Sequence, residues 1–143
     1  MQKSKSKYRN IPTERTTITG KVIKFHSKKE AERYDHLMIL LKAFEIKNLK
    51  LQPAFTLSES YTTPHGDKVG SIVYKADFSY ERKRKKYKMY KDPHGVTRTS
   101  AEYEEIWEYI VEDVKGGRAT QTADYKMKKK LMVEKFNIMI AEV

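Results

Sequence analysis

Three acidic residues and one lysine are the side chains of this sequence that could together hydrolyse a phosphodiester. Asp113 and Lys115 lie two positions apart at the end of an apolar run, so on a strand both would point to one face. Asp77 lies in another strand-like segment, and Glu30 lies near the start of a helical pattern. Three carboxylates beside an ammonium form a hard-oxygen site suited to Mg²⁺, which can activate water, while the lysine orients that water or offsets developing charge.

The sequence around Asp113 and Lys115 distinguishes this pair from other acid–lysine pairs in the chain. Only this pair follows an apolar strand and precedes a glycine pair, Gly116-Gly117, where a substrate backbone could approach closely. The alternative is a surface ion pair of little energetic value. A chain rich in acids and lysines produces such triplets by chance, and others occur at Glu45/Lys47, Glu81/Lys83 and Asp124/Lys126.

Two further acids leave alternatives open. Glu30 lies at the edge of a helix's buried stripe, where an acid needs a partner, but Ser27-Lys28-Lys29-Glu30 also forms a capping box in which Glu30 bonds back to the Ser27 amide. The two interpretations are compatible. Glu112 could replace Asp113 if the strand register were shifted by one residue, although Lys115 would then lie on the opposite face.

Hydrophobic spacing predicts two helices. Apolar residues recur at three- and four-residue steps from Tyr34 to Phe44, which predicts a helix over 27–47. A second helix is expected to begin after Thr120 or Thr122 and to end at Phe136, with Met127 and Leu131 facing the core.

Five segments have strand character, and one of them carries Asp77. Alternation of apolar and polar residues over 72–81 predicts one continuous strand with Asp77 on its polar face. The conformation of 100–105, short helix or ribbon, stays open, and 16–25 is compatible with a hairpin or a single strand. The other strands are expected at 49–57, 107–115 and 138–143.

The order of helix, strands, helix and strand predicts an α/β fold, a small mixed sheet flanked by helices. A length of 143 residues predicts a single domain over 16–143. Before it, residues 1–15 form a basic stretch with almost nothing apolar, which indicates a loosely held N-terminal arm.

Charge and cysteine content narrow the class of protein. Thirty Lys and Arg against nineteen Asp and Glu give a net charge of +11, which points to a polyanionic partner such as nucleic acid. The sequence contains no cysteine, apolar membrane span or secretory signal, so we expect a protein of the cytoplasm without a membrane partner. Scattered histidines and the lack of a Gly-Lys-Ser/Thr ending argue against a zinc site and an NTPase.

Two lysine- and arginine-rich stretches are the candidate DNA contacts, although solvated surface charge is the ordinary explanation for such runs. Tyrosines interleave the first stretch, where their rings could stack on bases. The candidate residues are Arg82, Lys83, Arg84, Lys85 and Lys86 in the first stretch and Lys126, Lys129 and Lys130 in the second helix.

Three of these motifs together resemble the PD-(D/E)XK nuclease superfamily, and in particular its phage-encoded domains related to small Holliday-junction-resolving endonucleases. The similarity covers about 21–143 and rests on Ser27-x-x-Glu30, Ala76-Asp77-Phe78 and Val111-Glu112-Asp113-Val114-Lys115-Gly116. It implies a restriction-endonuclease-like core that binds Mg²⁺ or Mn²⁺. The implied metal ligands are Glu30, Asp77, Asp113 and the backbone carbonyl of Val114, and Lys115 is the implied catalytic lysine.

The sequence departs from the superfamily pattern in two places. The proline that names the motif is Ala76 here, and the two strand acids are farther apart than usual, with an insertion around 82–105. The insertion indicates a ribbon or arm that contacts DNA or a second subunit, or a plain surface extension.

The expected function is therefore metal-dependent endonuclease activity on DNA, structure-specific for branched DNA in phage recombination or replication. A homodimer is expected by family analogy, since cutting two strands symmetrically needs two sites. The alternative is a basic nucleic-acid-binding module without catalysis.

Overall fold

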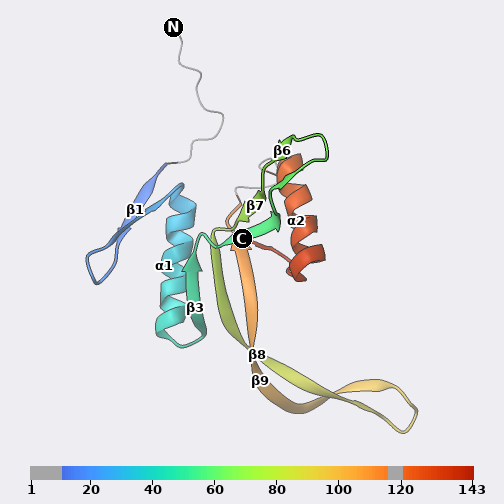
Figure 1. Ribbon diagram of the computed structural model, residues 1–143. Helices are drawn as coiled ribbons and strands as arrows, with labels where there is room; N and C mark the ends of the chain where they lie inside the picture. The colour runs from blue at the N-terminus through green and yellow to red at the C-terminus, as the bar shows by residue number, and fades with distance from the viewer. Residues whose placement is uncertain (1–10, 116–120) are drawn as a thin grey trace.

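The computed structural model describes residues 11–115 and 121–143 (Figure 1). Residues 1–10 of the expected N-terminal arm and the Gly116-Gly117 pair lie outside the described residues. The arm was predicted to extend to residue 15, but Thr13–Thr16 form strand β1 and Arg15 pairs with Asp35 of α1 (Lys28–Lys42). Within the described part, no helix has the length and apolar character needed to cross a bilayer.

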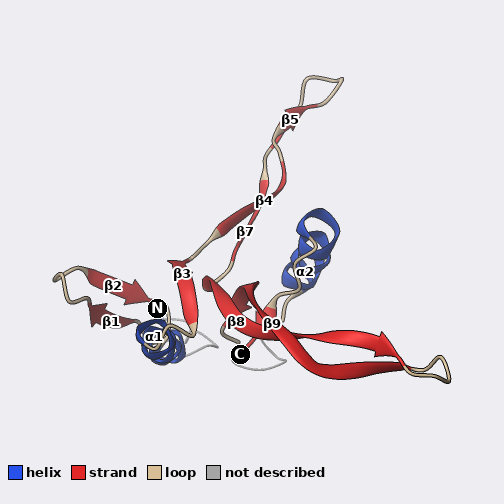
Figure 2. Ribbon diagram, turned by 90° about the horizontal axis from the view of Figure 1, so that it is seen from below, coloured by secondary structure: helices blue, strands red, loops and turns tan. Residues whose placement is uncertain are grey.

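A mixed four-stranded sheet forms the centre of the fold, in the order β10-β9-β8-β3. Strands β3 (Ile46–Leu51), β8 (Phe78–Lys91) and β9 (Thr97–Asp113) are antiparallel neighbours, whereas β10 (Ala141–Glu142) runs parallel to β9. The two helices pack on opposite sides of this sheet (Figures 1 and 2). The prediction of an α/β fold with a mixed sheet and flanking helices is confirmed at this level.

Helix α1 (Lys28–Lys42) begins at the predicted position but ends early. Its N-cap is Ser27, whose hydroxyl accepts a hydrogen bond from the Glu30 amide. The predicted end near residue 47 is wrong, because Phe44 adopts a left-handed φ of 58° and the chain turns directly into β3.

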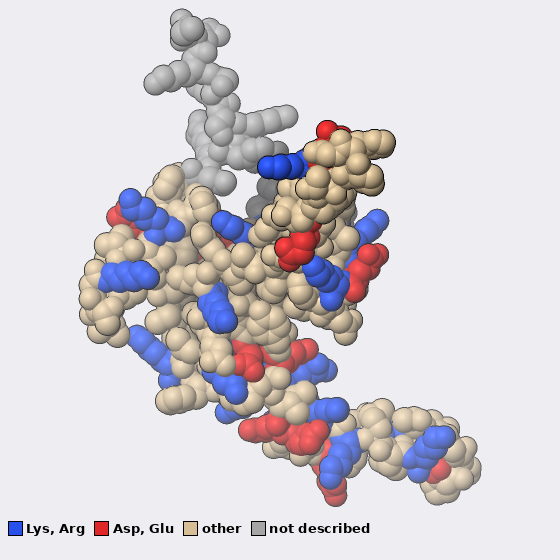
Figure 3. All heavy atoms as spheres, viewed as in Figure 1, with Lys and Arg blue, Asp and Glu red and all other residues tan. Residues whose placement is uncertain are grey.

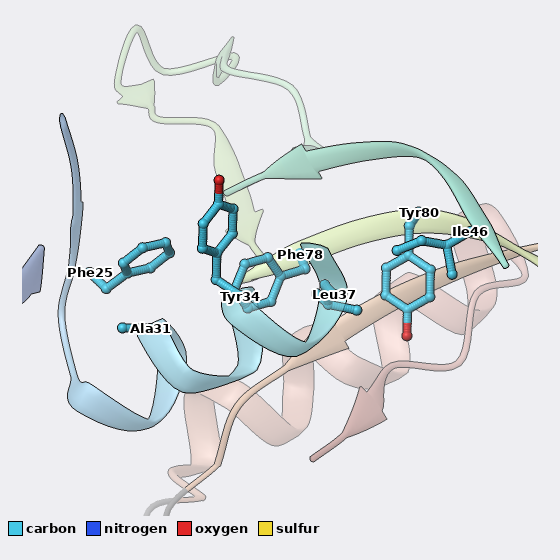
Figure 4. Close-up of a cluster of buried hydrophobic side chains, with 7 residues drawn as sticks. All are labelled: Phe25, Ala31, Tyr34, Leu37, Ile46, Phe78 and Tyr80. Atoms are coloured by element: carbon cyan, nitrogen blue, oxygen red, sulfur yellow. The ribbon is translucent and has the colours of Figure 1, made fainter. Parts of the chain in front are cut away.

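One hydrophobic cluster fixes α1 to the sheet (Figure 4). Strand alternation points the side chains of Phe78 and Tyr80 to this face, where they meet the buried stripe of the helix. Burial of each large apolar side chain contributes about 1.5–3 kcal/mol. The cluster comprises Phe25, Ala31, Tyr34, Leu37, Ile46, Phe78 and Tyr80.

A second cluster lies on the opposite face, under α2 (Ala123–Phe136). This helix begins at Thr122, one of the two predicted N-caps. The prediction that Met127 faces the core is wrong: its side chain is exposed, and Tyr125 and Met132 are buried instead. The cluster comprises Leu57, Tyr74, Ala76, Val111, Tyr125 and Met132, with Leu131 packed against it.

The strand predicted over 72–81 is broken at Ala76 and Asp77. Strand β7 (Ile72–Lys75) pairs with β4 (Ala54–Ser58), outside the central sheet, and β8 starts only at Phe78. The two residues between them donate their amides elsewhere, Ala76 to the Pro53 carbonyl and Asp77 to the Glu112 carbonyl. The break places Asp77 at the junction of the two sheets.

The other strand predictions differ mainly in their boundaries. The first segment forms a hairpin of β1 (Thr13–Thr16) and β2 (Val22–Phe25), one of the two open alternatives. The segment 49–57 is divided between β3 and β4, and the last strand is only two residues long. Strands β5 (Tyr61–Thr62) and β6 (Lys68–Val69) close a further small hairpin.

The insertion around 82–105 is an antiparallel ribbon, formed where β8 and β9 continue past their other partners. Figures 1 and 2 show this ribbon projecting from the rest of the molecule. Its register is regular from the pair Phe78–Glu112 to the pair Tyr87–Tyr103 and then shifts at one irregularity. Residues 100–105, left open by the sequence, belong to strand β9.

Candidate active site

Asp77 and Asp113, 36 positions apart in sequence, lie together in the structure. The Asp77 amide donates to Oδ1 of Asp113 over 3.1 Å, and the Val114 amide donates to Oδ2 of Asp77 over 2.7 Å. Asp77 lies at the strand break, and Asp113 ends strand β9. Each carboxylate is therefore oriented by the backbone that carries the other.

The remaining oxygen of Asp113 meets an aromatic hydroxyl and the predicted lysine. Tyr74 donates its hydroxyl hydrogen to Oδ2, and Nζ of Lys115 lies 3.5 Å from the same atom. Asp113 is only 3% exposed. Burial, followed by the hydrogen bond to Asp113, raises the pKa of Tyr74. The phenol is thereby kept protonated as a donor to the acid.

Lys115 is held by contacts on the α2 side. Its ammonium nitrogen lies 3.8 Å from the centroid of the Tyr125 ring, a cation–π arrangement. The Tyr125 hydroxyl in turn donates to Glu142 over 3.1 Å. The predicted sharing of one face by Asp113 and Lys115 agrees with these contacts, and Val114 packs against the first cluster on the other face.

Glu30 approaches Asp77 from the α1 side. Both residues line a hollow of about 130 Å³, together with Phe25 and Gln52. The capping box is confirmed only in part, since Glu30 accepts the amide of His26 over 3.2 Å instead of that of Ser27. Asp77 therefore lies between Glu30 on one side and the Asp113–Lys115 pair on the other.

The surroundings of Asp77 shift its pKa upward. Burial raises its pKa to about 6, the neighbouring charges of Asp113 and Glu30 act in the same direction, and the Val114 amide and Lys115 oppose them. A carboxylate surrounded by like charge in a partly dry environment gains from a cation.

Asp77 and Asp113 fit a Mg²⁺ site in which the protein supplies only some of the ligands. Among the residues that the structure describes, no three His, Cys, Asp or Glu side chains are arranged to hold an ion. Asp77 and Asp113 form a close pair, whereas the third predicted ligand, Glu30, only adjoins Asp77 through the shared hollow. Mg²⁺ usually takes one or two carboxylates and completes its coordination with water and phosphate.

Glu112 points away from this site. Its carboxylate forms a two-pronged ion pair with Arg33 of α1, over 2.6 and 2.9 Å, and accepts the Tyr80 hydroxyl over 2.7 Å. Glu112 is 1% exposed, and burial together with this contact raises the pKa of Tyr80 to about 12. The pairing gives Glu112 a structural role between α1 and the sheet.

The predicted DNA contacts fall on two separate elements. Arg82, Lys83, Arg84, Lys85 and Lys86 begin the ribbon, where their strand faces an acidic one and Arg84 pairs with Glu108 over 3.0 Å. Figure 3 shows basic and acidic side chains interleaved along this extension. On α2, Lys126 and Lys130 are exposed, whereas Lys129 is bound to Glu142.

Sequence reasoning missed the residues that support the acids. Tyr74 and Tyr125 belong to the apolar pattern, and Arg33 belongs to the charged face of α1, so their types and spacing gave no separate signal. Their partners lie 39, 17 and 79 positions away. Only the three-dimensional fold brings a phenol or guanidinium to these carboxylates.

The chain belongs to a family described as "Protein of unknown function (DUF1064)", whose model matches residues 5–108. The match includes Glu30 and Asp77 and ends before Asp113 and Lys115. No curated protein and no solved structure is significantly similar to the chain.

Proposed function

We propose that this protein is a metal-dependent endodeoxyribonuclease that hydrolyses phosphodiester bonds. The observation that carries the proposal is the pairing of Asp77 with Asp113 through reciprocal backbone hydrogen bonds, with Lys115 3.5 Å from Asp113. Two fixed acids beside an ammonium match what phosphodiester hydrolysis requires of a protein: metal ligands and a group that handles water or charge.

Each residue has a distinct role in the proposed reaction. Asp77 and Asp113 would hold Mg²⁺ or Mn²⁺, with the carbonyl of Val114 and the nearby Glu30 as further ligands by analogy with the superfamily. When bound, such an ion lowers the pKa of water and offsets phosphate charge. Lys115 orients the attacking water or stabilises the charge on the phosphate, and Tyr74 and Tyr125 keep Asp113 and Lys115 in place.

The arrangement of elements supports a restriction-endonuclease-like core. A helix carrying Glu30, the strand break at Asp77, strand β9 carrying Asp113, a second helix and a final parallel strand follow in that order. Asp77 immediately precedes β8 and Asp113 ends β9, and hydrogen bonds from backbone amides hold both carboxylates, which favours a precise site.

Charge supports DNA as the substrate. A net charge of +11 favours binding to phosphate backbones through release of counterions. Within this proposal the substrate is branched DNA, as in the resolution of junctions during phage recombination or replication in the host cytoplasm. Two sites in a homodimer would cut opposing strands, and light scattering at working concentration should give the mass of a dimer.

The test is cleavage of labelled branched and linear DNA with and without Mg²⁺ or Mn²⁺. We expect metal-dependent nicking that falls about 100-fold or more in Asp77→Asn, Asp113→Asn and Lys115→Ala, with DNA affinity largely retained. Glu59→Gln, at an exposed acid outside the site, is the control and should keep wild-type activity. Unchanged turnover in any of the three site variants would refute the mechanism.

The second candidate is a nucleic-acid-binding module without catalysis. It is favoured by the exposed lysines of α2 and by the aromatic and basic side chains of the ribbon. Binding unaffected by Asp113→Asn, with no nicking under any metal condition, would favour this candidate over the nuclease.

A further inference from the structure

One face of the β8–β9 ribbon carries a row of exposed aromatic rings. Pairing of Tyr87 with Tyr103, and regular alternation from there to the end of β9, place these rings on the same face as Asp113. Their exposed fractions lie between 39% and 49%, although tryptophan and tyrosine are usually better covered. We call Tyr87, Tyr103, Trp107 and Tyr109 the aromatic face of the ribbon.

The lysines around the aromatic face contact its rings. The ammonium of Lys47 lies 4.3 Å from the centroid of the Trp107 ring, and that of Lys83 lies 5.7 Å from it. Lys85 lies 4.5 Å from the Tyr103 ring. The face therefore combines π surfaces with adjacent positive charge.

On the aromatic face Lys85 stands opposite Glu105 in the strand register, and the opposite face also pairs its charges. There Arg84 is bound to Glu108, and Lys86 stands opposite Glu104 in the strand register. Over 82–108 the ribbon has eight basic and five acidic side chains, a net charge of +3. The ribbon alone therefore attracts phosphate only modestly. Its exposed aromatic rings are the feature that indicates a binding surface.

We propose that the aromatic face binds unpaired bases of DNA by stacking. This inference rests on the proposed function in taking DNA as the ligand, and it deepens that function by naming unpaired or extended strands as the recognised form. Aromatic side chains interleaved with basic ones are the usual means of binding single-stranded nucleic acid. Lys47, Lys83 and Lys85 would contact the adjoining phosphates.

Geometry favours an extended strand over an intact duplex. Side chains on one face of a strand recur about every 6.8 Å, twice the 3.4 Å rise per base of a stacked DNA strand. Bases inside a duplex hide their faces in the stack, so they have no surface to offer to Trp107 or Tyr109. The same face of β9 continues to Val111, which is buried beneath α2, so the row of exposed rings ends at Tyr109, four positions before Asp113.

The single tryptophan of the chain reports directly on this face. Wild-type protein in EDTA, which prevents metal-dependent cleavage, is titrated with an oligo-dT strand and with a blunt duplex of equal length. We expect the single strand to quench Trp107 emission by stacking, and the duplex to bind without comparable quenching. The anisotropy of labelled DNA measures binding independently of this emission.

Two variants test the contribution of individual rings. Tyr103→Ala and Trp107→Ala should each weaken oligo-dT binding about 5- to 150-fold, the effect of losing one stacked base. Tyr61→Ala, at an exposed ring on the separate β5–β6 hairpin, is the matched control and should bind as wild type does. Thermal unfolding of each variant confirms that it is folded.

The outcomes separate this inference from the proposed function. Oligo-dT binding without Trp107 quenching, or undiminished affinity in both ring variants, would refute stacking on the aromatic face. Neither result would bear on nuclease activity, which the cleavage assay tests separately. Failure to bind any DNA would refute stacking as well. A dimer in light scattering whose formation buries Trp107 without DNA would assign the face to a second copy and also refute the proposal. Quenching without cleavage in any metal would keep the stacking surface and reject the nuclease.

Discussion

The amide of Asp77 donates to the carboxylate of Asp113, while the amide that follows Asp113 in the chain donates to the carboxylate of Asp77. This reciprocal contact joins the start of β8 to the end of β9 by side chains as well as by the strand ladder. Two acids that would repel each other are thus fixed by donors before any ligand binds. This arrangement has measurable consequences.

The first concerns pH and stability. Because the pKa of Asp77 rises from 3.8 to about 6 on folding, the folded protein keeps a proton between about pH 4 and 6 that the unfolded chain has released. Raising the pH through this interval should therefore lower the free energy of unfolding. Asp77→Asn should lose this component, as urea unfolding of metal-free protein at several pH values would reveal. Identical pH profiles for variant and wild type would contradict the assignment.

Metal binding should produce the opposite effect at neutral pH. Mg²⁺ or Mn²⁺ at about 100 times its Kd should stabilise the folded protein by about 2.7 kcal/mol, since the ion binds only the assembled pair of acids. Asp77→Asn and Asp113→Asn should remove this stabilisation in a calorimetric or fluorescence melt, whereas Glu59→Gln should retain it. Equal stabilisation in all four proteins would place the ion elsewhere.

Tyr74→Phe tests the hydroxyl that supports Asp113. Removing a hydrogen bond to a metal-binding carboxylate typically costs 10- to 100-fold in metal affinity or activity, so we expect a cleavage rate lower by about that factor with unchanged DNA affinity. Tyr80→Phe is the matched control, because it deletes a buried hydroxyl that serves Glu112 outside the site. Equal losses of activity in the two variants would indicate a general effect on folding.

The buried ion pair between Arg33 and Glu112 should contribute more to stability than an exposed ion pair of α1 does. Arg33→Leu leaves a carboxylate that is 1% exposed without its cation, and such losses destabilise proteins by about 3–5 kcal/mol. Arg15→Leu removes a similar guanidinium–carboxylate pair with Asp35 at the surface, where about 0–1 kcal/mol is expected. Urea unfolding measures both, and comparable losses would refute the difference in burial as the cause.

Salt dependence tests the lysines of α2. DNA affinity of the wild type should fall steeply as salt rises, and the double substitution of Lys126 and Lys130 by alanine should reduce the slope of log K against log salt by about 2. The same substitution should leave Mg²⁺-induced stabilisation unchanged. A slope equal to that of the wild type would remove these two residues from the DNA interface.

The sequence predicted local features better than long-range ones. Ser27 was predicted as an N-cap, and Thr122 as one of two candidates, because such signals lie within one helical turn. The shared face of Asp113 and Lys115 likewise follows from strand alternation alone. The break at Ala76 and Asp77 was missed, since a regular apolar–polar pattern continues across it. Its cause is remote: carbonyls of Pro53 and Glu112 accept the two amides.

The acids of the candidate site could be selected from the sequence, whereas the residues that hold them could not. An acidic residue is a candidate metal ligand by its type alone. Tyr74 and Arg33 have the types of ordinary core and surface residues, and only their partners in the structure reveal their roles. Met127 is the opposite case. Its spacing fits a core position, but its side chain is exposed and α2 buries Tyr125 and Met132 instead. Tertiary packing selects among faces that periodicity leaves nearly equal.

The ribbon has a consequence for how this fold can change. Past Arg82 and Glu108, the described side chains of the ribbon belong to neither hydrophobic cluster. Its length is therefore adjustable: trimming matched pairs of residues from both strands in steps of two would preserve the alternation that leads into β9. The reach of the ribbon could vary in this way among related chains while Asp77 and Asp113 at its base keep their places.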